Sequence, residues 1–165
     1  MIQTIYSILS LIRFKNIIIA TLCVLLGVYI LSYYNESRTL LCIIIIISSM
    51  SFGNILNDIV DLGNDKINHA ERVLPKTKLS LQTAYYLAYI CLCITFITSL
   101  YIPQIAQISL LAIFFLLILY NFYLKSMVLI GNFIVAFLLS AVFIFTEMVL
   151  LGTYTNLIIP ASLAF

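Results

Sequence analysis

The chain has 165 residues, of which 64% are hydrophobic and 8% are charged, and its mean hydropathy is +1.21. This composition excludes a water-soluble globular domain and indicates an integral membrane protein. The net charge of +2 gives no reason to expect a nucleic acid partner, because the basic residues of a membrane protein serve as loop anchors.

Uncharged runs define the expected membrane spans, since a helix needs about 17 to 25 mostly apolar residues to cross the hydrocarbon core. The stretch 79–124 is long enough for two spans, and Pro103 near its middle predicts a turn between them. In chain order the expected spans are 17–34, 39–56, two helices within 79–124, 127–151, which is interrupted only by Glu147, and the opening of a sixth span at 157–165. We expect an all-α, polytopic bundle that forms a single domain over residues 1–165.

Two ionisable residues outside the main cluster have ordinary interpretations. Glu147 is the acid within the fifth run, and we expect it to meet water at the far side, because Thr153, Tyr154 and Asn156 follow closely. The alternative for Glu147 is a buried polar contact. We expect His69 to be a solvated loop histidine.

The basic residues predict the orientation of the chain. Threading five spans from the N-terminus places one basic residue, Arg38, on one side and seven on the other, so the latter side should be cytoplasmic. The seven are Arg13, Lys15, Lys66, Arg72, Lys76, Lys78 and Lys125. The sequence therefore predicts a multi-pass protein of the cell membrane with these loops in the cytoplasm.

Half of the six acidic residues lie within the stretch NILNDIVDLGND, at the expected cytoplasmic end of the second span. If that span continues as a helix, polar residues spaced three or four apart share one face. These are Asn54, Asp58, Asp61, Asp65, Asn68 and Arg72. Pro75 then predicts the end of the helix and a loop over 73–80.

Three like charges on one helical face repel each other, and a divalent cation would remove that cost. Mg2+ takes oxygen ligands and is commonly held by one or two carboxylates together with the oxygens of a substrate phosphate. Asn54, Asn57 and Asn68 can add carbonyl ligands or hydrogen bonds. Arg72, with Lys76 or Lys78, can meet the remaining diphosphate charge. A solvated surface of carboxylates is the plainer alternative.

The motif NDIVDLGND, with Lys66, Asn68, Arg72 and Pro75 after it, resembles the first aspartate-rich motif of the UbiA superfamily of intramembrane prenyltransferases. LIRFKNIIIA resembles the family's entry to its first helix and matches at Arg13 and Asn16. LYNFYLKSMVLIGNFIVA resembles the junction of the fourth and fifth helices, with matches at Tyr120, Tyr123, Lys125, Gly131 and Asn132.

The resemblance implies a ring of transmembrane helices, normally nine, around a central cavity that holds Mg2+ and a polyprenyl diphosphate. Asp58, Asp61 and Asp65 would be catalytic, as metal ligands or as residues that support those ligands, and Arg72 and Lys125 would hold the diphosphate. The remaining substrate-binding positions would be Asn16, Asn54, Asn57, Asn68, Tyr120 and Asn132. The implied reaction is transfer of the prenyl group to a lipophilic acceptor.

The acceptor and the completeness of the site stay open at this point. The run from Asp65 to Arg72 resembles the branch that alkylates geranylgeranylglyceryl phosphate, and the branch that alkylates aromatic quinone precursors is the alternative. The family carries a second aspartate-rich motif beyond the part that this chain resembles, so we expect the N-terminal part of the fold with incomplete activity. The other interpretation is a non-catalytic membrane protein or degenerate remnant whose acidic stripe binds a cation or a partner. The oligomeric state is not predicted.

Overall fold

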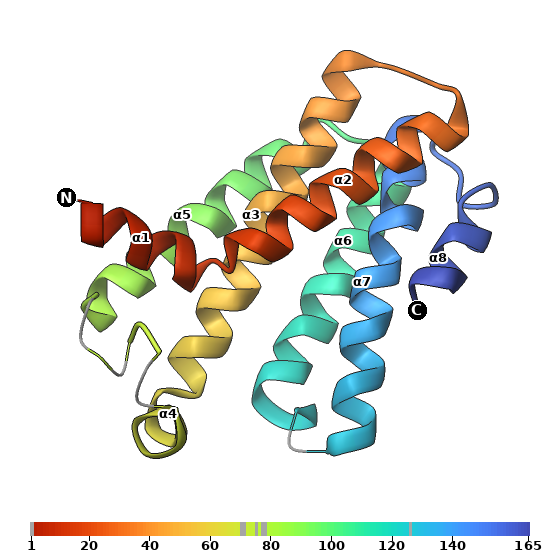
Figure 1. Ribbon diagram of the computed structural model, residues 1–165. Coiled ribbons are helices and arrows are strands. Elements are labelled where there is room, and N and C mark those ends of the chain that lie inside the picture. Colours follow the sequence, from red (N-terminus) through yellow and green to blue (C-terminus); the bar gives the residue numbers. More distant parts are fainter. Residues whose placement is uncertain (1, 70–71, 75, 77–78, 126) are drawn as a thin grey trace.

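The computed structural model of the chain describes residues 2–69, 72–74, 76, 79–125 and 127–165 (Figure 1). Within these ranges every regular element is a helix, so the predicted all-α fold is confirmed. Pro75 and Lys78 lie outside the described residues. The elements are α1 (Ile2–Leu11), α2 (Phe14–Leu31), α3 (Glu36–Val60), α4 (Leu62–Asn68), α5 (Leu81–Ser99), α6 (Gln104–Leu119), the π-helical turn η1 (Tyr120–Leu124), α7 (Val128–Leu151) and α8 (Ile158–Ala164).

Five of these segments are long and apolar enough to cross a membrane: α2, α3, α5, α6 with η1, and α7. They coincide with the five predicted spans, and the turn expected at Pro103 separates α5 from α6. Side chains cap two of the helices. Asn35 Oδ1 accepts from the Arg38 amide at 3.0 Å, and Ser80 Oγ accepts from the Thr83 amide at 3.0 Å.

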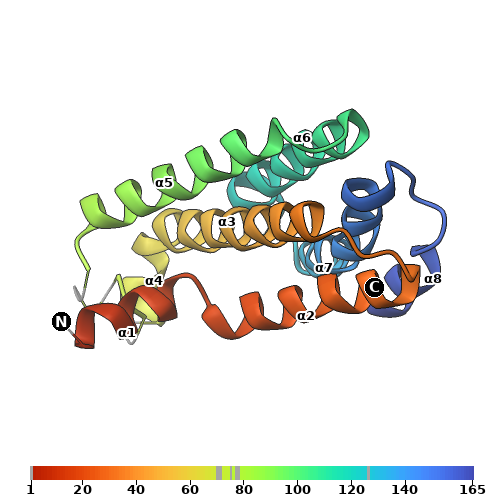
Figure 2. The same ribbon diagram turned by 90° about the horizontal axis from the view of Figure 1, so that it is seen from above.

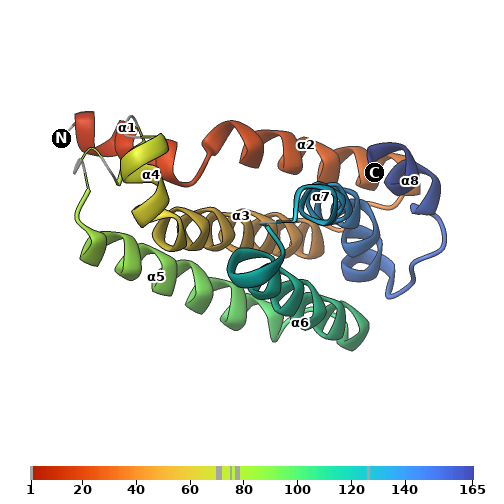
Figure 3. The same ribbon diagram turned by 90° about the horizontal axis from the view of Figure 1, so that it is seen from below.

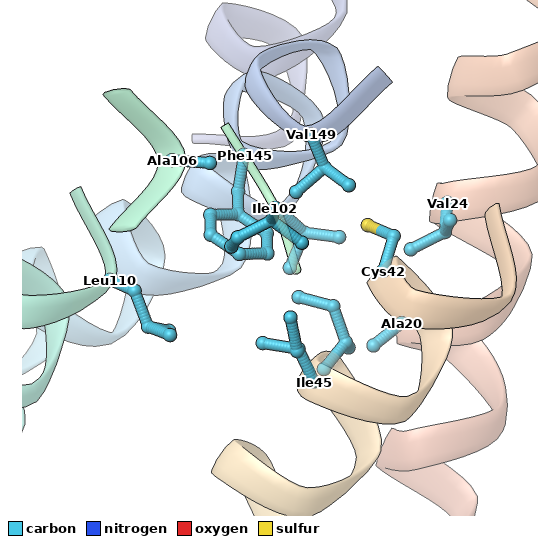
Figure 4. Packing of buried hydrophobic residues seen from close by; sticks show 11 residues of the cluster. Ala20, Val24, Cys42, Ile45, Ile102, Ala106, Leu110, Phe145 and Val149 are labelled. Carbon is cyan, nitrogen blue, oxygen red and sulfur yellow. The ribbon is translucent and has the colours of Figure 1, made fainter. Parts of the chain in front are cut away.

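Helix α3 lies at the centre of the bundle. Figures 2 and 3 show it between α2 and α5, and it also packs against α7. The largest buried cluster joins α2, α3, α6 and α7 through small, branched and aromatic side chains, among them Ala20, Cys42, Ile45 and Phe145 (Figure 4). A second cluster around Ile55 packs α1 and α5 against the other end of α3.

The continuous helix predicted beyond the second span is interrupted. Helix α3 ends at Val60, and the short helix α4 begins at Leu62. The Asp61 amide still donates to the Asn57 carbonyl oxygen at 2.9 Å, so the break is a change of direction rather than a loop. The polar residues predicted to share one face therefore do not lie along a single continuous helix.

The preferred prediction for Glu147 is wrong, because this side chain is fully buried. Its carboxylate accepts hydrogen bonds from Thr153 Oγ1 at 2.8 Å, from the main-chain amides of Thr155, Asn156 and Leu157, and from Asn156 Nδ2. The polar residues after α7 fold back over Glu147 instead of carrying it into water. The alternative of a buried polar contact describes the residue correctly.

Candidate functional site

A cavity of about 690 Å³ lies among α2, α3, α6, η1 and α7. Its polar lining gathers at one end of the bundle, which we call the charged end. The polar lining residues there are Arg13, Asn16, Asn54, Asn57, Asp61, Asn64, Arg72, Tyr120, Asn121 and Lys125. The rest of the wall is an apolar groove that includes Met50, Leu110, Phe114, Leu138 and Phe145. The cavity thus joins a charged mouth to a long apolar compartment.

Each aspartate of the motif forms an ion pair with a different basic residue. Asp58 contacts Arg13 Nη2 at 3.4 Å, Asp65 contacts Arg72 Nη1 at 2.7 Å, and Asp61 contacts Lys125 Nζ. Arg13 comes from the junction of α1 and α2, and Lys125 follows η1, so these pairs join segments far apart in sequence. They hold three separate parts of the chain around the charged end.

The three carboxylates differ in burial and in access to the cavity. Asp58 and Asp65 are 8% and 3% exposed and do not line the cavity, whereas Asp61 does. No three His, Cys, Asp or Glu side chains of the described residues gather as ligands for one metal ion. The structure therefore does not bring Asp58, Asp61 and Asp65 together as ligands of one ion, since Arg13 and Arg72 hold the two outer carboxylates.

The other predicted site residues also separate into two sets. Those that line the cavity are Asn16, Asn54, Asn57, Arg72, Tyr120 and Lys125. Asn68 and Asn132 are exposed and lie outside the lining. Asn54 has a structural contact as well, since its Nδ2 donates to the Ile12 carbonyl oxygen at 2.9 Å.

Two lining residues, Asn64 and Asn121, were not predicted from the sequence. Asn64 lies one turn beyond Asp61 in α4, and this spacing of three residues is the signal that could have placed it on the same face as Asp61. Asn121 is 2% exposed and lies in η1, in a span without charged residues. An amide in such a span is itself a signal, because buried polar groups in membrane helices are costly.

The oxygen donors at the charged end fit a magnesium ion. Asn57, Asp61 and Asn64 line the same cavity and offer one carboxylate and two amide oxygens. This set matches the preference of Mg2+ for a few hard protein oxygens together with water and phosphate oxygens. Asp58 and Asp65 would support that site indirectly, by fixing the positions of Arg13 and Arg72.

The environment of Arg72 keeps it cationic. Burial alone would lower the pKa of its guanidinium, but the hydrogen bond to Asp65 and the nearby charges of Asp65, Asp58 and Asp61 raise the pKa above its ordinary value. A guanidinium held in this way presents a fixed positive charge to the cavity.

We expect Asp65→Asn to lower the free energy of unfolding by about 2 kcal/mol, because it removes a charged partner from a nearly buried hydrogen bond. Thermal unfolding in detergent measures the change. The control is Glu36→Gln, an exposed acid at the other end of α3, for which we expect a change below about 0.5 kcal/mol. Equal shifts for the two variants would contradict a structural role for Asp65.

Comparison with known proteins gives consistent matches. A sequence model described as the UbiA prenyltransferase family matches residues 19–165. The chain is 37% identical over 139 residues to digeranylgeranylglyceryl phosphate synthase of Methanococcus maripaludis strain C7, covering 82% of this chain and 50% of that protein. It is 33% identical over 139 residues to the protein of the same name from Methanocaldococcus jannaschii, covering 83% of this chain and 49% of the relative.

A solved structure described as concerning digeranylgeranylglyceryl phosphate synthase in membranes has the same fold. It superposes with a TM-score of 0.83 at 31% sequence identity, over 98% of this chain and 57% of that one. The chain therefore spans about half the length of the curated relatives it matches, and it corresponds to slightly more of the solved structure.

Proposed function

The chain belongs to the UbiA prenyltransferase family, and from that premise we propose that its cavity binds a polyprenyl diphosphate with Mg2+ and transfers the prenyl group to a lipophilic acceptor. The observation that carries the proposal is the form of the cavity, in which cations and oxygen ligands at one end continue into an apolar groove. A prenyl diphosphate has the same division into a charged head and an apolar chain. This match favours an enzyme over a membrane protein that binds a cation or partner alone.

The three cations that line the cavity among the described residues, Arg13, Arg72 and Lys125, would bind the diphosphate. Arg13 and Arg72 are held by Asp58 and Asp65, so both guanidinium groups are already positioned when the donor arrives. Lys125 contacts Asp61, and donor binding would exchange these partners, with the ammonium moving to a diphosphate oxygen and the carboxylate to the metal. The exchange leaves neither charge unpaired, which limits its cost in the membrane.

Bound Mg2+ would neutralise charge on the diphosphate and so favour its departure. The apolar groove would determine whether water or the acceptor reacts with the allylic carbon. Phe114, Phe145 and aliphatic side chains line it, so water is largely excluded and the developing cation meets the acceptor instead. Phe114 also packs against Phe52 with ring centroids 5.5 Å apart, which fixes its position in the wall.

For the acceptor we propose a glyceryl phosphate ether lipid with a geranylgeranyl donor. The support is the shared name of the relatives and of the solved structure, digeranylgeranylglyceryl phosphate synthase. An aromatic quinone precursor is the second candidate within the same family. The excess of basic residues at the charged end further supports a cytoplasmic location for the mouth of the cavity.

The test uses protein made from its native gene, purified in detergent and supplied with labelled geranylgeranyl diphosphate. We expect prenylated product with geranylgeranylglyceryl phosphate, little or none with 4-hydroxybenzoate, and loss of product when the metal is chelated. Preference for the aromatic acceptor would correct the acceptor, and no metal-dependent transfer to either would overturn the proposal.

Gly53 gives a specific test of the groove. A Cβ atom at this position would lie 2.7 Å from Leu117 Cδ1, so the wall has no room for a larger side chain without displacing Leu117. We expect Gly53→Val to raise the KM for a geranylgeranyl donor about tenfold, since overpacking costs about 1–3 kcal/mol. Steady-state kinetics at saturating acceptor measures the change.

The matched control is Gly63→Ala. A Cβ atom there meets no atom within 4 Å, so the donor KM should not change. An unchanged donor KM for Gly53→Val would mean that the prenyl chain does not lie along this part of α3.

A further inference from the structure

Asn121 carries a polar atom that the fold leaves without a partner. Its Nδ2 donates to the Leu117 carbonyl oxygen at 2.9 Å, but its Oδ1 has no hydrogen-bond partner among the described residues. The residue is 2% exposed and lines the cavity. A buried carbonyl oxygen without a partner lowers folding stability, so packing of the helix does not account for an amide at this position.

The position of Asn121 indicates which part of a substrate would reach it. Asn121 precedes Lys125 by four residues, so about one helical turn of 5 Å separates them. Since α6 and η1 run toward the charged end, Asn121 lies on the groove side of Lys125. If Lys125 binds the diphosphate, the allylic carbon bonded to that diphosphate lies at the level of Asn121. This step rests on the proposed function.

The chemistry of Asn121 Oδ1 limits which part of a substrate can be its hydrogen-bond partner. Oδ1 needs a hydrogen-bond donor, whereas the ionised diphosphate offers acceptors and the prenyl chain offers neither. A hydroxyl group on the acceptor substrate is a donor, and it must approach the allylic carbon at this level. We propose that Asn121 Oδ1 accepts a hydrogen bond from the hydroxyl group that attacks the allylic carbon and thereby positions the acceptor.

In the transfer, the acceptor oxygen forms a bond to the allylic carbon, and the bond from that carbon to the diphosphate oxygen breaks. The electron pair of the broken bond leaves with the diphosphate. The hydroxyl proton also passes to the departing diphosphate, because an amide oxygen is too weak a base to hold it. Asn121 therefore binds and orients the nucleophile and does not deprotonate it.

The test is Asn121→Leu, which keeps the branched shape of the side chain and replaces the amide oxygen and nitrogen with methyl groups, in protein made from its native gene. We expect the KM for geranylgeranylglyceryl phosphate to rise about tenfold while the KM for the donor stays within about twofold, as loss of one hydrogen bond predicts. An acceptor analogue with hydrogen in place of the hydroxyl group should inhibit by competing with the acceptor, and its inhibition constant should be the same for the unaltered protein and the variant.

Thr39→Val is the matched control, because Thr39 Oγ1 is also buried without a partner among the described residues but does not line the cavity. It should leave both KM values unchanged and should not lower the unfolding temperature. If Asn121→Leu accumulates poorly, Asn121→Ala removes the same oxygen and should raise the acceptor KM to a similar extent.

An acceptor KM that does not change in Asn121→Leu would overturn this inference while leaving the proposed function intact. Equal rises in both KM values, or a higher Mg2+ requirement with the acceptor KM unchanged, would assign Oδ1 to the donor or the metal and would also overturn it. No transfer by the unaltered protein would overturn the proposed function and this inference together.

Discussion

Asp61→Asn is expected to lower the rate of prenyl transfer by about 100-fold or more while the protein stays folded. Of the three motif aspartates, Asp61 is the one that lines the cavity, where Asn57 and Asn64 add oxygen donors. Its carboxylate is partly accessible, with 19% of the side chain exposed, so the substitution does not strand a buried charge. Initial rates at saturating Mg2+ and thermal unfolding, measured on the same preparation, separate the two effects.

The double variant Asp61→Asn with Lys125→Met distinguishes catalysis from structure. If the two residues only stabilise the charged end as an ion pair, removing both should do less harm than removing either. If Asp61 holds the metal and Lys125 the diphosphate, the double variant should be at least as inactive as Asp61→Asn. Recovery of activity in the double variant would assign Asp61 to assembly of the bundle.

Glu147→Gln is expected to lower the free energy of unfolding by about 3 kcal/mol, the largest effect on stability that we predict. Each hydrogen bond of the carboxylate uses Glu147 as the acceptor, including those from the Leu157 amide at 2.8 Å and from Thr153 Oγ1 at 2.8 Å. A glutamine must turn its own N–H groups toward some of these donors. The loop between α7 and α8 would then lose its anchor, although the cavity lies elsewhere.

Thermal unfolding in detergent measures this change, with Glu36→Gln as the control because Glu36 is exposed. Catalytic rate per folded molecule should not change, since Glu147 does not line the cavity. A shift no larger than that of the control would mean that water readily replaces the carboxylate at the end of α7.

The membrane spans could be predicted because their determinants are local. A run of uncharged residues specifies a span by its length, and Pro103 separates two spans without reference to any other part of the chain. The polar composition of the site was predictable for the same reason, since the aspartates of the motif and Lys125 can be read directly from the sequence. The family resemblance drew on these same local features.

Which side chains of the motif face the cavity could not be predicted, because this depends on contacts outside the motif. Asp65 is buried against Arg72 and does not line the cavity, whereas Asn64, three residues after Asp61, does. Arg13, 45 residues from Asp58 in sequence, then holds that carboxylate against the junction of α1 and α2. Helical spacing alone can place Asn64 on the face of Asp61, but it cannot anticipate that ion pairs bury Asp58 and Asp65.

Glu147 shows the same limit at the other end of the bundle. In the sequence, the polar residues after α7 led to the prediction that Glu147 meets water. In the structure, the main-chain amides of this segment donate hydrogen bonds to the Glu147 carboxylate instead. Gly152, with a φ of 73°, ends α7 and allows the chain to turn back. A buried acid and a solvated acid can therefore have the same neighbours in sequence.

The claim that the cavity is the donor site is tested most directly by photolabelling with a geranylgeranyl diphosphate analogue that carries a diazirine in its chain. We predict labelling of groove residues of α3, α6 and α7, such as Met50, Phe114 and Phe145, that requires Mg2+ and is suppressed by unlabelled donor. Labelling confined to exposed residues outside the cavity, such as Tyr89 and Phe96, or labelling indifferent to Mg2+ and to competing donor, would contradict the claim.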